Sequence, residues 1–95
     1  MTKQQKESCR MIANHYGKDS QVLVAIEEMS ELIKELCKYF QRFDRIKEIT
    51  EEIADVEIMV EQLKTLFENH DEVGNVIDYK LERQMQRMEL EKGSE

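Results

Sequence analysis

The sequence contains no proline or tryptophan and only three glycines, and aromatic residues make up 6% of its 95 residues. Turn-rich β-structures need glycine and proline at their turns, so this composition disfavours a β-sandwich or barrel and favours long helices. A chain of this length corresponds to one small domain with a thin core. We therefore expect a single all-α domain over residues 1–95, with an aliphatic core and a frayed tail over residues 91–95.

Long apolar runs are also missing. The charge-free stretches fall well short of the roughly 18 residues that a membrane-spanning helix needs, and the first ten residues lack the apolar core of a signal peptide. Cys9 and Cys37 lie far apart without a metal-ligand spacing, so we expect them to be reduced packing residues. The sequence thus predicts a cytoplasmic protein without a membrane partner.

Acidic residues outnumber basic ones by 21 to 14, which gives a net charge of −7. This balance disfavours nucleic acids and anionic membranes as partners, because binding to their phosphates needs a basic surface. It leaves a nucleotide substrate open, since divalent cations can lie between carboxylates and phosphates. The alternative is a solvated acidic surface that binds nothing.

The apolar spacing predicts four helices. The first is expected from about Thr2 to Tyr16, with Gly17 as its end and Asp19 or Ser20 as the next N-cap. Spacings of three and four place apolar residues on one face of each of the other helices. These residues are Val22, Ile26, Met29, Ile33, Leu36 and Phe40; Ile46, Ile49, Ile53, Val56, Val60, Leu63 and Phe67; and, in a fourth helix over about 71–90, Val73, Ile77, Leu81, Met85 and Met88. In the first helix, the residues on one side are Cys9, Ile12, Ala13 and Tyr16.

One long helix from Gln21 to Asn69 is the alternative to separate second and third helices. At about 100° per residue, the apolar residues from Val22 to Phe40 stay within roughly 40° of one direction, whereas Ile46 would point about 120–180° away. A chain reversal near residues 41–43 removes this conflict. The phase therefore predicts an antiparallel helical hairpin, with Asp44 as the N-cap of its second helix.

Two acidic clusters lie on the two arms of this hairpin. Glu28 and Glu31 share a face of the first arm, and Glu52 and Asp55 share a face of the second, because each pair is three residues apart. Antiparallel helices rise equally on both sides of their turn. The residue numbers of Glu31 and Glu52, and those of Glu28 and Asp55, both average 41.5, which lies within the predicted turn. Four carboxylates are therefore expected at one level.

Clustered carboxylates repel one another unless a cation neutralises them. Oxygen ligands without cysteine or histidine suit Mg²⁺ first, and Mn²⁺ or Ca²⁺ second. A di-iron site would need Glu-x-x-His on two helices, and neither His15 nor His70 follows a glutamate at that spacing, which disfavours iron. The alternative is a solvated face, because 37% of the residues are charged and Glu28, Glu31 and Glu35 lie away from the apolar seam.

The two acidic clusters carry a resemblance to a known family. Glu27-Glu28-x-x-Glu31, followed about twenty residues later by Glu52-x-x-Asp55, resembles the signature of the MazG-like all-α nucleoside triphosphate pyrophosphohydrolases. The resemblance extends over roughly residues 12–88. It implies a four-helix, MazG-like bundle completed by oligomerisation. The two apolar seams and the fourth helix with Met85 and Met88 also present much apolar surface for 95 residues, which predicts a homo-oligomer, a dimer or a dimer of dimers. It also implies Mg²⁺-dependent cleavage of a nucleoside triphosphate to the monophosphate and pyrophosphate.

The resemblance further implies roles for individual residues. Glu28, Glu31, Glu52 and Asp55 would bind the metal, and Glu27 would orient a ligand or the attacking water. Four basic residues are candidates for binding the phosphates, namely Lys38, Lys80, Arg83 and Arg87. The last three recur on one face of the fourth helix, where they could converge on one phosphate chain or form a solvated basic stripe. Tyr39 or Phe40 could stack on the base, although Phe40 belongs to the apolar seam.

Other functions stay open on the sequence alone. Within the same superfamily, a dUTP-cleaving or phosphoribosyl-ATP-cleaving enzyme is the nearest alternative. A different class is a non-catalytic helical interaction module, which would use its apolar seams to pair with a partner helix. Stabilisation by millimolar Mg²⁺ would separate the metalloenzymes from such a module.

Overall fold

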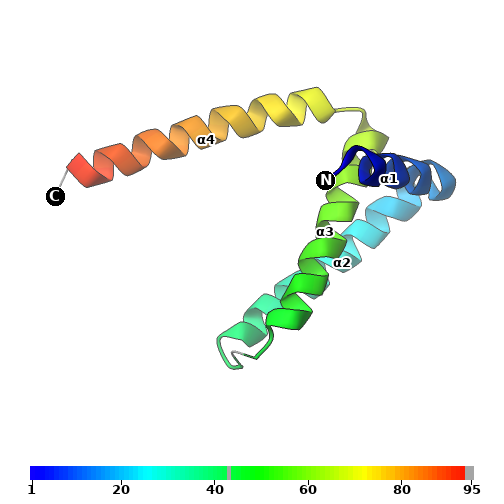
Figure 1. Cartoon of the computed structure of the whole chain (residues 1–95), viewed down its shortest axis with the longest axis horizontal. Coiled ribbons are helices and arrows are strands. Elements are labelled where there is room, and N and C mark those ends of the chain that lie inside the picture. Colours follow the sequence, from blue (N-terminus) through cyan, green and yellow to red (C-terminus); the bar gives the residue numbers. More distant parts are fainter. Residues whose placement is uncertain (43, 94–95) are drawn as a thin grey trace.

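A computed structural model describes residues 1–42 and 44–93, and all regular secondary structure in these ranges is helical. Figure 1 shows the four helices, which are α1 (Lys3–Tyr16), α2 (Lys18–Tyr39), α3 (Ile46–Phe67) and α4 (His70–Gly93). The predicted all-α class with four helices is therefore confirmed. None of the helices in the described ranges combines the length and apolar character needed to cross a bilayer.

The two ends of α1 have clear local causes. Thr2 forms a capping box with Gln5, in which each side chain accepts a hydrogen bond from the other residue's backbone N–H. Gly17 ends α1 as predicted, with a φ of 90° that glycine adopts without a Cβ clash. α2 starts directly afterwards at Lys18. The predicted N-cap at Asp19 or Ser20 is therefore wrong, because both residues already lie in the first turn of α2.

The hairpin between α2 and α3 is confirmed, and the single long helix is excluded. α2 ends at Tyr39 and α3 starts at Ile46, so the chain reverses where the phase of the apolar residues predicts. The N-cap of α3 is Arg45 rather than the predicted Asp44. The predicted reversal includes Phe43, which lies outside the described residues.

The apolar seams are not the core of the single chain. Ile33 on α2 is 62% exposed and Ile53 on α3 is 44% exposed. Phe40, which directly follows α2, is 80% exposed, so its predicted core position is wrong. The buried apolar residues are Cys9, Ala13, Ala25 and Met59. α2 and α3 instead meet through a polar face, whose buried members include Gln21, Glu35 and Gln62.

The first helix follows its prediction only in part. Cys9 and Ala13 are buried, whereas Ile12 and Tyr16 are exposed. Both cysteines are free, but Cys37 is exposed and is not a packing residue. α1 packs against α3 and α2, and its small residues allow that close approach.

α4 leaves the other three helices as an extended arm (Figure 1). Among the helices it contacts only α3, and none of its residues is buried. Ile77, Leu81, Met85 and Met88 are all exposed, so their predicted inward position is wrong for the single chain. Val73, predicted on the same face, is half-buried near the start of the helix. The helix continues to Gly93, into the segment 91–95 expected to be frayed; residues 94 and 95 lie outside the described ranges.

Candidate metal centre

Three carboxylates meet between the arms of the hairpin. Glu28 on α2 and Glu52 and Asp55 on α3 each place one carboxylate oxygen within 4.8 Å of the others. Glu28 and Glu52 are half-buried, and Asp55 is exposed. The sequence predicts that Glu28 and Asp55 lie level, and the structure brings them together. We call these residues the three-carboxylate group.

Burial and like charges raise the pKa values of two members of the three-carboxylate group, Glu28 and Glu52. Burial and the charges of Asp55, Glu52 and Glu31 raise the pKa of Glu28, to which a hydrogen bond with Asp55 also contributes. Burial, followed by the charges of Asp55 and Glu31, raises the pKa of Glu52. Both directions have the same cause, because desolvation and like charges disfavour the ionised carboxylate.

One oxygen of the group lacks any partner in the described part of the chain. Oε2 of Glu52 is fully buried and makes no hydrogen bond there. A buried carboxylate oxygen without a donor costs free energy unless a proton or a cation satisfies it. Oxygen-only donors are the set that Mg²⁺ and Mn²⁺ prefer, and Mg²⁺ commonly takes its remaining ligands from water and substrate phosphates. The residues present therefore fit a hard divalent cation.

The other two acidic candidates lie outside the three-carboxylate group. Glu31 is exposed, and its charge still contributes to the raised pKa values of Glu28 and Glu52. Glu31 therefore lies near the three-carboxylate group but is not one of its members. Glu27 is also exposed, at the position next to Glu28 on α2.

The structure does not bring the basic candidates to the carboxylates within one chain. Lys38 forms an ion pair of 3.6 Å with Glu35 at the turn end of α2. Lys80, Arg83 and Arg87 are all exposed on α4, which points away from the hairpin (Figure 1). The guanidinium of Arg83 lies 5.6 Å from the centre of the Tyr79 ring.

An ion pair between Glu35 and Arg45, which the sequence did not predict, lies between the three-carboxylate group and the hairpin turn. Arg45 donates two hydrogen bonds to Oε2 of Glu35, of 3.0 Å from Nε and 2.7 Å from Nη2. Hydrogen bonding to Arg45 lowers the pKa of Glu35. Glu35 follows Glu28 by seven residues and thus shares its helix face, which is the signal that could have placed it in the interface.

Comparisons with protein-family models, with curated proteins and with solved structures gave no match to this chain. What the structure defines is an all-α chain with a hairpin that holds three carboxylates together. The three-carboxylate group and the two-part acidic motif that supplies it are therefore the features of this chain that bear on function.

Proposed function

We propose that this protein is a Mg²⁺-dependent nucleoside triphosphate pyrophosphohydrolase of the MazG-like type, in which Mn²⁺ can replace Mg²⁺. The observation that carries the proposal is the buried, unpartnered Oε2 of Glu52 within the three-carboxylate group. Both halves of the acidic motif contribute to that group, Glu28 from the first and Glu52 and Asp55 from the second. Glu48 on α3 also buries a carboxylate oxygen without a donor, but of these two glutamates Glu52 is the one with carboxylate oxygens of two other residues within 4.8 Å.

The proposed chemistry assigns a task to each acidic residue. When bound, the metal would neutralise phosphate oxygens, polarise the phosphorus and lower the pKa of a bound water. Glu28, Glu52 and Asp55 bind the cation, and the neighbouring Glu31 is the proposed fourth ligand. Glu27, exposed beside Glu28, orients the attacking water. A carboxylate oxygen that does not bind metal accepts the proton of that water.

The bond that breaks defines the products. The water oxygen forms a bond to the α- or β-phosphorus, and the bridging P–O bond between these two phosphates breaks. The products are a nucleoside monophosphate and intact pyrophosphate, while the proton of the water passes to a carboxylate. Holding the departing pyrophosphate takes several cationic donors, and Lys38, Lys80, Arg83 and Arg87 are the proposed ones.

Three of these four basic residues belong to α4, which points away from the hairpin of its own chain (Figure 1). The proposed site therefore needs the α4 of a second chain. We propose a homo-oligomer, a dimer or a dimer of dimers, in which another copy covers the apolar seams of α2 and α3. Exposed apolar patches of this extent usually mark interaction surfaces, and Leu23, Ile26 and Ile33 are each more than half exposed. We also propose a cytoplasmic location, where free cysteines such as Cys9 and Cys37 stay reduced.

The exposed seams also favour a second candidate, a non-catalytic helical interaction module. The two candidates predict different results in one assay. Purified protein with Mg²⁺ is incubated with a panel of canonical and modified nucleoside triphosphates, including dUTP, and with phosphoribosyl-ATP. Pyrophosphate and orthophosphate are measured separately. The proposal predicts monophosphate and pyrophosphate in equal amounts; orthophosphate with a diphosphate, or no turnover of any substrate, would contradict it.

A further inference from the structure

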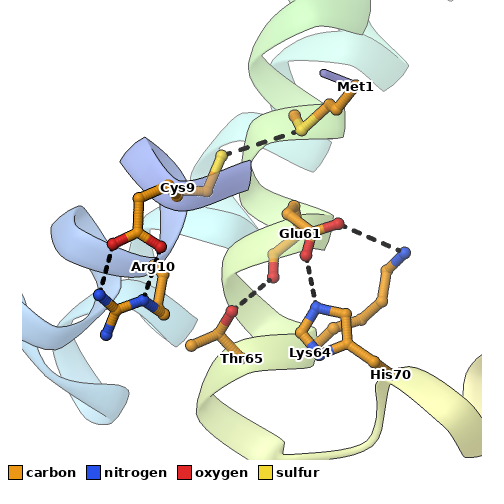
Figure 2. Close-up of polar contacts among 8 residues, drawn as sticks. Met1, Cys9, Arg10, Glu61, Lys64, Thr65 and His70 are labelled. Carbon is orange, nitrogen blue, oxygen red and sulfur yellow. Dashed lines mark hydrogen bonds and ion pairs between the residues drawn. The ribbon is translucent and has the colours of Figure 1, made fainter. Parts of the chain in front are cut away.

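The first residue of α4 is held by a buried carboxylate on α3. Glu61 is 6% exposed, and its Oε2 contacts Nε2 of His70 at 2.5 Å. Nζ of Lys64 lies 3.8 Å from the other oxygen of Glu61. Figure 2 shows both side chains converging on this carboxylate from the end of α3 and the start of α4.

α4 packs only lightly against the rest of the described chain. The helix contacts only α3 among the helices, buries none of its residues, and is joined to α3 by Glu68 and Asn69 alone. Glu68 adopts a left-handed conformation with a φ of 53°, which is uncommon for a residue with a Cβ. The contact between Glu61 and His70 is a side-chain contact that joins α3 to α4 across this hinge.

The charged groups around this contact come from three helices. On α1, the buried Cys9 lies close enough for the charge of Glu61 to contribute, after burial, to the raised pKa of its thiol. A surface cavity of about 380 Å³ between α1 and α3 includes both Glu61 and Lys64 in its lining. Other ionisable residues line this cavity or lie in the first turn of α4, namely Lys6, Glu57, Asp71 and Glu72. α2 contributes no ion pair to Glu61 or His70 within the described ranges.

We propose that Glu61 and His70 form a latch that sets the direction in which α4 leaves α3. The carboxylate of Glu61 is buried on α3, and its contact with Nε2 of His70 ties the first residue of α4 to that position. Hydrogen bonds to a carboxylate are stronger than those between neutral groups. Lys64 contacts the other oxygen of this carboxylate from within α3 and therefore cannot tie α4.

A consequence for the enzyme rests on the proposed function. α4 carries Lys80, Arg83 and Arg87, so the latch would set where these phosphate-binding candidates point. The latch itself is tested without nucleotide or metal, so its failure and the failure of the proposed function are distinguishable.

The test measures the distance between spin labels on α2 and α4 by pulsed electron paramagnetic resonance. Labels are attached to the exposed Cys37 and to the thiol introduced by Glu89→Cys, while burial protects Cys9. An excess of unlabelled protein restricts the signal to distances within one chain. We expect the distance distribution to be narrow in the wild type and about twofold broader in His70→Ala.

Variants assign the effect to the latch. His70→Ala removes the contact and should broaden the distribution, and His70→Asn, which keeps a side-chain hydrogen-bond donor, should broaden it less. His15→Ala changes the other histidine, which is exposed on α1, and should behave like the wild type. A distribution in His70→Ala as narrow as that of the wild type would overturn the proposal.

Discussion

Gln21 donates a hydrogen bond of 2.6 Å from its Nε2 to Oε1 of Gln62 across the interface of α2 and α3, and both side chains are buried. Two helical turns further toward the hairpin turn, Glu28 follows Gln21 and Asp55 precedes Gln62 by the same seven residues. The amide pair therefore fixes the register at which the two carboxylates meet. A slip of one residue would break this hydrogen bond as well as the three-carboxylate group.

The amide pair makes a stability prediction. Gln62→Ala leaves the amide of Gln21 buried without its partner, which costs about 1–3 kcal/mol of unfolding free energy. Replacing both glutamines with leucine removes both polar groups and should cost less than the single change. Urea denaturation measures both variants, with the exposed Gln86→Ala as control. The interpretation fails if Gln62→Ala is as stable as this control.

The ion pair between Glu35 and Arg45 predicts a dependence on pH. Arg45 lowers the pKa of Glu35 in the folded protein. The pair therefore stabilises the fold fully above the pKa of a glutamate in the unfolded chain, about 4.3. This contribution is lost as the pH falls through the lower pKa of Glu35 in the folded protein. Arg45→Gln should therefore lower the melting temperature at about pH 7. The difference from wild type should shrink as the pH is taken below about 4.

Lys38→Gln is the matched control for this prediction. Lys38 is more exposed than Arg45 and lies 3.6 Å from the same carboxylate, so solvent screens the pair and its removal should have a smaller effect. Thermal melts of both variants across the pH range provide the comparison. Equal losses in the two variants, or a loss for Arg45→Gln that does not depend on pH, would be inconsistent with this role of Glu35.

The junction of α3 and α4 predicts a stabilising substitution. The N–H of Asn69 bonds to the carbonyl of Lys64 and that of Glu68 to the carbonyl of Thr65, which is a Schellman motif with Glu68 at the position that usually holds glycine. Glu68→Gly relieves the left-handed conformation and should raise stability by about 0.5–1 kcal/mol. Denaturant melts measure this change, and a destabilised variant would contradict the backbone geometry at Glu68.

The exposed apolar seams predict an assembly. Light scattering at micromolar concentration should give the mass of a dimer or a dimer of dimers. Ile33 is 62% exposed in the seam of α2, so Ile33→Glu should shift the protein toward monomer by placing a charge in the proposed interface. Lys34→Glu changes the neighbouring exposed position and should leave the assembly intact. A monomeric wild type would exclude the proposed oligomer.

Local rules explain what the sequence predicts well. Helical periodicity gives the helices, Gly17 gives the end of α1, and the phase of the apolar residues gives the hairpin. The equal rise of antiparallel helices places Glu28 beside Asp55. The helices and the end of α1 depend on residues within a few turns along the chain. The hairpin and the meeting of Glu28 with Asp55 follow from the phase and the rise of two helices about one short turn, so these features can also be read from spacing.

Tertiary choices explain what the sequence did not predict. Periodicity identifies the apolar face of α2, but the single chain packs α2 on α3 through the polar face that carries Gln21 and Glu35, and Ile33 stays exposed. An apolar face indicates that a helix is buried against something, but it does not indicate which element packs on that face. At the start of α4 lie the left-handed backbone of Glu68 and the contact of His70 with Glu61, and no apolar pattern encodes either.

The central claim is that the three-carboxylate group binds a divalent cation. Calorimetric titration of Mg²⁺ and Mn²⁺ into metal-free wild type and Asp55→Asn tests it most directly, with circular dichroism to verify the fold and Glu82→Gln on α4 as control. We predict that wild type and Glu82→Gln bind alike, that Asp55→Asn binds at least about 10-fold more weakly, and that its metal-free melting temperature rises because one repelling charge is gone. Equal affinities in a folded Asp55→Asn would contradict the claim.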